Sequence, residues 1–98
     1  MGKRKLVTEM SPAATAKKIA AIIEDELNLN PGSVGAGDSL GYDLHADSLD
    51  HTMIMVRIEE EFGIYFPKEV YDDITHKTSV WDLIEATENV LKDNRKYE

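Results

Sequence analysis

Side chains that could take part in catalysis are concentrated in residues 43–51, which read DLHADSLDH. Ser48 would need a base within hydrogen-bond reach and an oxyanion hole to act as a nucleophile. The G-x-S-x-G elbow of serine hydrolases is absent, because Ala46 and Asp50 stand in place of its glycines. A serine at an exposed helix start also lacks a pocket that excludes water. We therefore predict no catalytic residue.

The same segment is rich in groups that can bind metals, among them Asp43, His45 and His51. Their spacing matches neither the H-E-x-x-H zinc motif nor the calcium loop of EF-hands, so we predict no structural metal. Clustered carboxylates could still bind a divalent cation weakly. A plainer role is structural, in which Asp47 is the N-cap of a helix and Asp50 completes an acidic capping box.

The composition indicates one small globular domain. The chain has 98 residues, of which 42% are hydrophobic and 31% charged, and at this length a single modest core is expected. There is no cysteine, which excludes disulfides, thiolate metal sites and cysteine nucleophiles and makes a cytoplasmic protein the simplest expectation. No apolar run approaches the roughly 20 residues that span a bilayer, so we expect no membrane partner.

The net charge of −8 arises in one part of the chain, because residues 38–74 contain ten acidic and two basic residues. Such a field disfavours nucleic-acid binding and attracts basic protein surfaces. Solubility alone is the other explanation for it.

The hydrophobic periodicity predicts an all-α four-helix bundle with three longer helices and one short helix. We expect helices from Pro12 to about Asn28, over 48–62, over 68–74 and from Thr78-Ser79 onward. A long connection between the first two carries four of the six glycines, and loops of that length are usually functional or disordered. We expect a flexible N-terminal arm at residues 1–10, one domain at 11–93 and a frayed tail at 94–98.

The helix expected at 48–62 has apolar residues on two faces. One face, which we assign to the core, carries Ile54, Met55, Ile58 and Phe62. The opposite face carries Leu49, Met53 and Val56 beside acidic residues. A small domain cannot bury both faces of a surface helix, so the second face is either a partner site or a set of tolerated surface residues. Elsewhere we expect a core of Ile23, Leu27, Leu40, Val80, Ile84 and Leu91.

The stretch from Asp43 to Asp50 resembles the D-L-G-A-D-S-L-D signature of acyl carrier proteins. The resemblance covers residues 13–92, since Glu-Glu-Glu-Phe at 59–62 ends the second helix and Phe66-Pro67 precedes the third. The D-S-L tripeptide alone is a weak signal, but its combination with the downstream E-E-E-F is specific. Three positions depart from the family. They are His45, where the family usually has glycine, Met53, where it often has glutamate, and Arg57, where it has a small residue.

The resemblance implies that a phosphopantetheinyl transferase moves 4′-phosphopantetheine from coenzyme A to Ser48. The thiol of this group would carry acyl chains as thioesters in fatty-acid or related acyl or polyketide biosynthesis, and the chain would be a monomeric carrier, not an enzyme. The helix after the serine would dock on basic patches of acyl-processing enzymes. The docking candidates are Asp47, Leu49, Asp50, Met53, Val56, Glu59 and Glu60.

Two alternatives remain open. An aminoacyl or peptidyl carrier would share the serine and the fold. An unmodified acidic helical adaptor, from a different functional class, would bind partners without a prosthetic group. Among acyl carriers, the three departures fit a carrier dedicated to one pathway as well as a general fatty-acid carrier.

Overall fold

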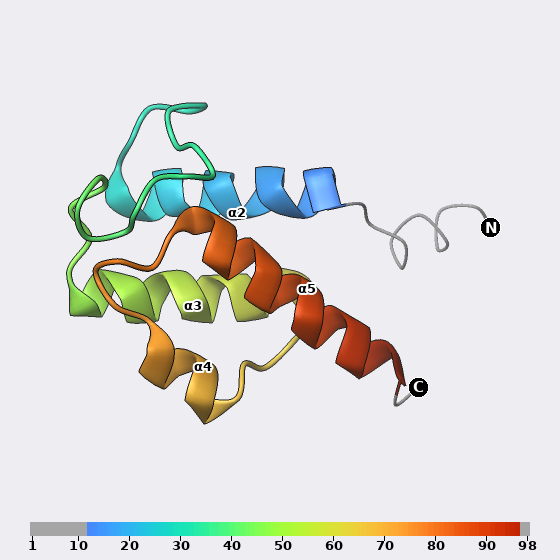
Figure 1. Cartoon of the computed structure of the whole chain (residues 1–98). Helices are drawn as coiled ribbons and strands as arrows, with labels where there is room; N and C mark the ends of the chain where they lie inside the picture. The colour runs from blue at the N-terminus through green and yellow to red at the C-terminus, as the bar shows by residue number, and fades with distance from the viewer. Residues whose placement is uncertain (1–11, 97–98) are drawn as a thin grey trace.

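The computed structural model describes residues 12–96, which form four α-helices and no strand. In chain order these are α2 (Pro12–Leu27), α3 (Ser48–Phe62), α4 (Lys68–Asp73) and α5 (Val80–Lys96). Helix α2 packs against both α3 and α5. The short α4 lies at the foot of the bundle, and the connection over 28–47 folds at one end of it (Figure 1). The expected all-α fold with one short helix is confirmed.

Two expectations concern the ends of the chain. The N-terminal arm that we expected at residues 1–10 lies outside the described residues. At the other end α5 extends to Lys96, three residues past the limit at residue 93 that we expected.

Apolar side chains from α2, α3, α5 and the connections form one core. Its fully buried members include Ile19, Ile23, Leu40, Ile54, Met55, Ile58, Val80 and Leu83, and Ile84 is nearly so. Three residues that we expected in the core, Leu27, Phe62 and Leu91, are only partly buried and pack against its edge. Leu27 and Phe62 are the last residues of their helices, so no further turn of the same helix covers them.

The start of α3 is fixed by the predicted capping box. The Asp47 carboxylate accepts a hydrogen bond from the Asp50 N–H at 2.8 Å, and the Asp50 carboxylate accepts one from the Asp47 N–H at 3.0 Å. The helix ends at Gly63, whose φ of 66° is left-handed, and the Ile64 N–H bonds back to the Glu59 carbonyl at 3.1 Å. Both ends of α3, and with them the place of Ser48, follow from local sequence.

The glycine-rich connection over 28–47 is held by backbone hydrogen bonds to the segment between α4 and α5. The N–H groups of Leu40 and Gly41 donate to the carbonyls of Thr78 and His76 at 2.8 and 3.0 Å. A Cβ at Gly41 would lie 2.5 Å from the His76 Cβ, so no larger residue fits there. The connection is therefore held in place by the segment between α4 and α5, and His76 lies at the end of the bundle where α3 begins.

A buried carboxylate organises the start of the same connection. Glu24 is 8% exposed, and its Oε2 accepts hydrogen bonds from the N–H groups of Gly32 and Val34 at 3.0 and 3.1 Å. Charged groups are buried at low cost only when they are hydrogen-bonded in this way. The hydrophobic periodicity of the sequence did not predict that Glu24 would hold this connection.

Candidate functional site

Ser48 is exposed at the first position of α3. The first N–H groups of a helix have no partner within the helix, and the helix dipole is positive at this end, so a phosphoester on the serine hydroxyl would be stabilised. The carboxylates of Asp47 and Asp50 share this turn and oppose that effect. The Asp50 N–H bonded to Asp47 holds the pKa of the Asp47 carboxyl below its usual value, so this carboxyl is ionised at neutral pH.

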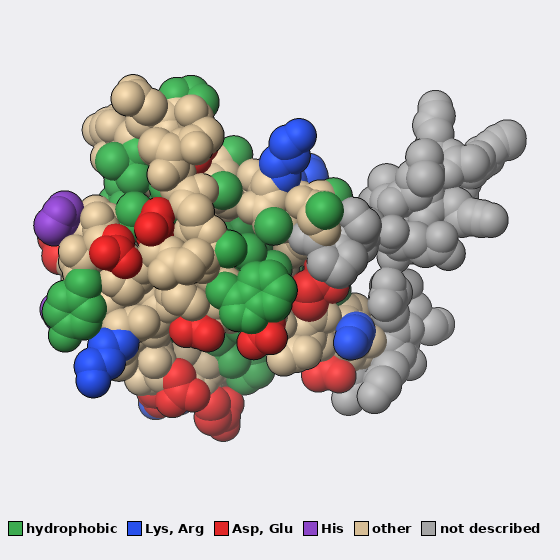
Figure 2. Space-filling view, turned by 45° about the horizontal axis from the view of Figure 1, so that its top comes forward, with side chains coloured by type: hydrophobic (Ala, Val, Ile, Leu, Met, Phe, Trp, Pro, Cys, Tyr) green, Lys and Arg blue, Asp and Glu red, His purple; other side chains and the backbone are tan. Residues whose placement is uncertain are grey.

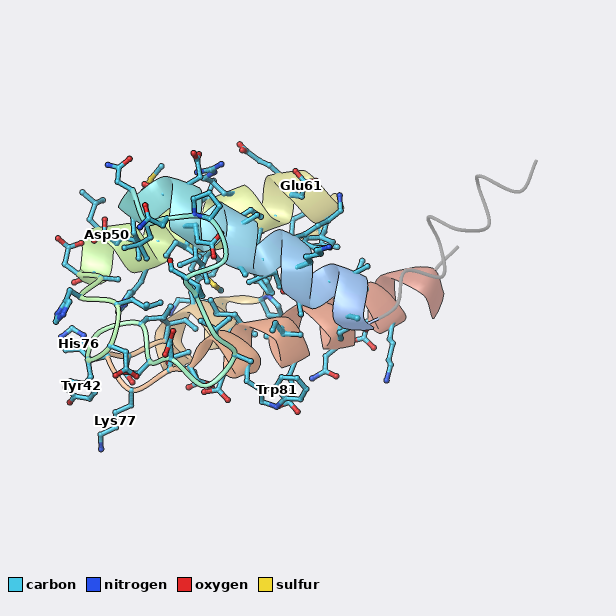
Figure 3. All side chains as sticks on the ribbon, turned by 90° about the horizontal axis from the view of Figure 1, so that it is seen from above. Tyr42, Asp50, Glu61, His76, Lys77 and Trp81 are labelled. Atoms are coloured by element: carbon cyan, nitrogen blue, oxygen red, sulfur yellow. The ribbon has the colours of Figure 1, made fainter. Side chains whose placement is uncertain are left out.

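Two cavities open beside Ser48. The larger, of about 450 Å³, is lined by Tyr42, Ser48, His51, Ile74, Thr75, His76 and Lys77. The smaller, of about 130 Å³, is lined by Ser48, His51, Thr52, Met55, Tyr71 and Ile74. Ser48, His51 and Ile74 belong to both. Figure 3 shows Tyr42, His76 and Lys77 projecting together from the corner where the 28–47 connection meets the segment before α5.

His51 lies one turn into α3 and faces inward, with 7% of its surface exposed. Its Nε2 atom has no hydrogen-bond partner among the described residues. The ring stands edge-to-face against His76, with centroids 5.8 Å apart. Burial chiefly, and then the charge of His76, lower the pKa of His51, while Asp47, Asp50 and a backbone hydrogen bond to Ala46 act in the opposite direction. His51 is therefore a neutral imidazole near pH 7.

The inward position of His51 could have been read from the sequence. Residues 51, 54, 55 and 58 are spaced as i, i+3, i+4 and i+7, which is the stripe that we assigned to the core. We considered His51 as a metal-binding group because of its residue type, whereas its spacing indicated a buried position on the core face of α3.

The second apolar face of α3 reaches the surface, as its spacing indicated. Leu49 is 69% exposed and Met53 is 40% exposed, while Val56 is partly buried. Glu60 is exposed beside them and, with Val56 and Tyr65, lines a surface cavity of about 400 Å³ at the far end of the helix. Acidic side chains also outnumber basic ones on the face drawn in Figure 2.

Glu59, one of the seven docking candidates, makes internal contacts. Its Oε2 accepts a hydrogen bond from the Phe66 N–H at 2.7 Å. Its carboxylate also binds the Tyr71 hydroxyl, and burial together with this bond raises the pKa of Tyr71 to about 12. Glu59 thus connects α3 to the segment before α4 and to α4 itself.

Arg57 binds the neighbouring helix. Its guanidinium lies 2.9 Å from a carboxylate oxygen of Asp25 and 3.3 Å from one of Glu26, both on α2. These two partners, Asp25 first, raise the pKa of Arg57. Arg57 departs from the expected family pattern, but these carboxylates neutralise its positive charge where α3 contacts α2.

His45 has a left-handed backbone, with φ of 60°. This is the position at which the acyl-carrier pattern has glycine, and glycine adopts that conformation without the steric cost that a Cβ adds. His45 therefore has a backbone conformation that a glycine at this position would adopt at lower cost.

Residues 12–96 contain no group of three or more side chains placed to bind a metal ion. Within the same range no helix has the length and apolar character needed to cross a membrane.

The site has the features that a phosphopantetheine group requires. The Ser48 hydroxyl is exposed, so another enzyme can reach it, and the cavity of about 450 Å³ beside it has room for a bulky substituent. The chain itself has no cysteine, so its own side chains supply no thiol.

Comparison with known proteins agrees with this geometry. Residues 17–78 match the family model described as the phosphopantetheine attachment site. The chain is 35% identical over 75 residues to an acyl carrier protein of Thermosynechococcus vestitus, which covers 76% of this chain and 93% of that one. It is 31% identical over 77 residues to an acyl carrier protein of Prochlorococcus marinus, covering 79% and 96%. It is 39% identical over 71 residues to the chloroplastic acyl carrier protein 1 of Casuarina glauca, covering 72% of this chain but only 52% of that longer one.

Proposed function

Because the chain belongs to the acyl carrier protein family, whose members carry 4′-phosphopantetheine and are not enzymes, we propose that Ser48 is the attachment residue. The observation that carries this proposal is the exposed Ser48 hydroxyl at the capped start of α3, beside a cavity of about 450 Å³. The capping box supports it further, since it holds the serine in the first turn, where a phosphoester gains most from the helix dipole.

The attached group would supply the thiol that holds acyl chains as thioesters. We propose that the protein passes these chains between enzymes of fatty-acid or related acyl biosynthesis. The protein's own residues present the arm and bind the enzymes. We propose that the protein performs this role as a monomer in the cytoplasm.

We propose that partners dock on the exposed face of α3 around Leu49 and Met53. Val56, Asp47 and Glu60 border these two residues, and Asp50 completes the acidic first turn. Acidic groups at the edge of such a patch accelerate encounter with a basic partner, while a small apolar centre gives a contact that is easily released. We propose that Glu59 connects α3 to α4 and does not contact partners, because its carboxylate already has two internal partners.

Intact mass spectrometry tests the attachment. After incubation with coenzyme A and a broadly specific phosphopantetheinyl transferase, the chain should gain about 340 Da, the mass of the phosphopantetheinyl group. Peptide mapping should place the gain on Ser48, and Ser48→Ala should abolish it. A gain on Ser39 or Ser79 would contradict attachment at Ser48, and no gain at all would favour the unmodified adaptor.

A second assay separates acyl from aminoacyl carriers. The loaded protein is offered to fatty-acid enzymes that charge the arm with acyl groups and, in parallel, to enzymes that activate amino acids. We expect charging by the first set. Charging by the second set alone would identify an aminoacyl or peptidyl carrier.

A further inference from the structure

Three aromatic rings join the start of α3 to the two segments beside it. The His76 ring stands edge-to-face against the His51 ring of α3, with centroids 5.8 Å apart. It also stands edge-to-face against Tyr42 of the 28–47 connection, at 6.2 Å. Figure 3 shows Tyr42 and His76 together at this corner of the molecule. The position of the His76 ring thus depends on both α3 and the connection.

Backbone hydrogen bonds hold the segment that carries His76. The N–H groups of Leu40 and Gly41 donate to the carbonyls of Thr78 and His76 at 2.8 and 3.0 Å. Leu40 is 1% exposed, so its side chain anchors the connection in the core. If the segment moved away from α3, the connection could not follow, and both hydrogen bonds would break.

The buried His51 has no acceptor for a second proton. Its Nε2 has no hydrogen-bond partner among the described residues, and the ring bonds to the backbone of Ala46. The carboxylates of Asp47 and Asp50 lie in the same turn, but they accept the N–H groups of the capping box. A proton on Nε2 would therefore be a buried donor without an acceptor, and it would place a charge against the His76 ring. Both effects are unfavourable.

Charged and titratable groups face His51 from α3, from α4 and from the two segments beside them. They are Asp47 and Asp50 on α3, Tyr71 on α4, Tyr42 in the connection, and His76 and Lys77 before α5. Burial, the largest influence, and His76 lower the pKa of His51, whereas the two aspartates act in the opposite direction. Lys77 adds positive charge to the same cavity. This arrangement therefore favours the neutral imidazole.

We propose that His51 and His76 form an acid-sensitive latch between α3 and the segment before α5, closed while His51 is neutral and opened by its protonation. In the open form the His76 ring leaves His51, water reaches Nε2, and the two hydrogen bonds from Leu40 and Gly41 are lost. Ser48 keeps its place, because the capping box lies within α3. Acid thus changes the surroundings of Ser48 and not its position.

The sign of the pH dependence follows from the burial of His51. In the open form the ring is in water, where its pKa is the ordinary 6.5, and in the closed form its pKa is lower. As pH falls below 6.5 the open form takes up the proton first. The ratio of open to closed protein should then rise by up to about tenfold per pH unit, until the lower pKa is reached. Above pH 6.5 the latch stays closed.

Nuclear magnetic resonance of the isotope-labelled full chain tests the latch without any substitution. Scalar couplings across hydrogen bonds report the bonds of Leu40 and Gly41 directly, and the His51 ring signals report its protonation. We expect both couplings at pH 7.5 and their loss by pH 5, with the midpoint at which His51 titrates, while the couplings within α3 persist. A His51 that is protonated with both couplings intact, or still neutral at pH 5, would overturn the proposal. Simultaneous loss of the α3 couplings would also overturn it, since the whole chain then unfolds.

Two variants show whether His51 is the residue that senses acid. His51→Phe keeps a buried ring that cannot take up a proton, so both couplings should persist at pH 5. The matched control is His45→Asn, which removes an exposed histidine and substitutes a residue that tolerates the left-handed backbone there. It should lose the couplings as the wild type does. Loss of the couplings in His51→Phe, or their persistence in His45→Asn, would overturn the proposal.

Discussion

The Glu59 carboxylate accepts a hydrogen bond from the backbone N–H of Phe66 at 2.7 Å. The bond joins the last turn of α3 to the chain that leads into α4, and the Tyr71 hydroxyl on α4 binds the same carboxylate. Glu60, the next residue, is exposed. Both glutamates were docking candidates in the sequence. In the structure Glu59 makes bonds within the fold, whereas Glu60 lies on its surface.

Reversing these two charges should separate stability from partner binding. Glu59→Lys should lower the free energy of unfolding by about 1–3 kcal/mol, because the Phe66 N–H loses a charged acceptor. Glu60→Lys should change it by no more than about 0.5 kcal/mol, as is usual for surface substitutions. Urea unfolding measures both. Equal stability of the two variants would contradict the internal role of Glu59.

Replacing His45 by glycine should stabilise the protein. A residue with a Cβ in the left-handed conformation lowers the free energy of unfolding by roughly 1–2 kcal/mol. Glycine removes this cost, but part of the gain is lost because glycine has a larger conformational entropy in the unfolded chain. We expect a net increase of about 0.5–1 kcal/mol in the free energy of unfolding. His45→Ala is the matched control and should give no such gain, since alanine keeps the Cβ. A similar gain in both variants would mean that the imidazole, and not the backbone, is unfavourable there.

The buried His51 should make stability depend on pH. Its folded pKa lies below the usual 6.5, so as pH falls the unfolded chain takes up the proton first. The stability that this site contributes is fully present above pH 6.5 and is lost as pH falls through 6.5 toward the folded value. The free energy of unfolding of the wild type, minus that of His51→Phe, should therefore decrease between pH 7.5 and 5. A difference that is constant over this range would show that His51 titrates normally in the folded protein.

The docking face should respond differently to charge and to apolar contact. Glu60→Lys should slow association with the transferase by roughly 3-fold or more at low salt, and the loss should shrink at high salt because steering is screened. Met53→Ala should chiefly speed dissociation, because it removes contact area. Stopped-flow binding at two salt concentrations measures both rates. If both variants alter only the dissociation rate, the acidic residues do not steer the encounter.

Met53 also offers a test of the pathway. Met53→Glu restores the acid that the family often has at this position, and we expect it to raise kcat/KM of general fatty-acid enzymes acting on the loaded protein. That increase would indicate a carrier dedicated to another pathway. Unchanged turnover, with a wild type that is already a good substrate, would indicate a general fatty-acid carrier.

The sequence by itself determined the features that depend on near neighbours in the chain. The capping box of Asp47 and Asp50, the left-handed Gly63 and the apolar stripe of α3 all involve residues within about one or two turns. Such interactions form whenever the helix forms, so they can be read from spacing. They also fix Ser48 at an exposed helix start, and the motif around it was enough to indicate the family.

Only the tertiary structure decided what the remaining polar residues do. Glu24, Arg57 and Glu59 look like surface charges in the sequence, yet each holds a group from another segment. The cavity beside Ser48 likewise exists because Gly41 approaches His76 closely enough to bring a distant segment against the start of α3. Contacts between distant segments leave no periodic pattern in the chain, because they depend on how the helices and connections pack once they have formed.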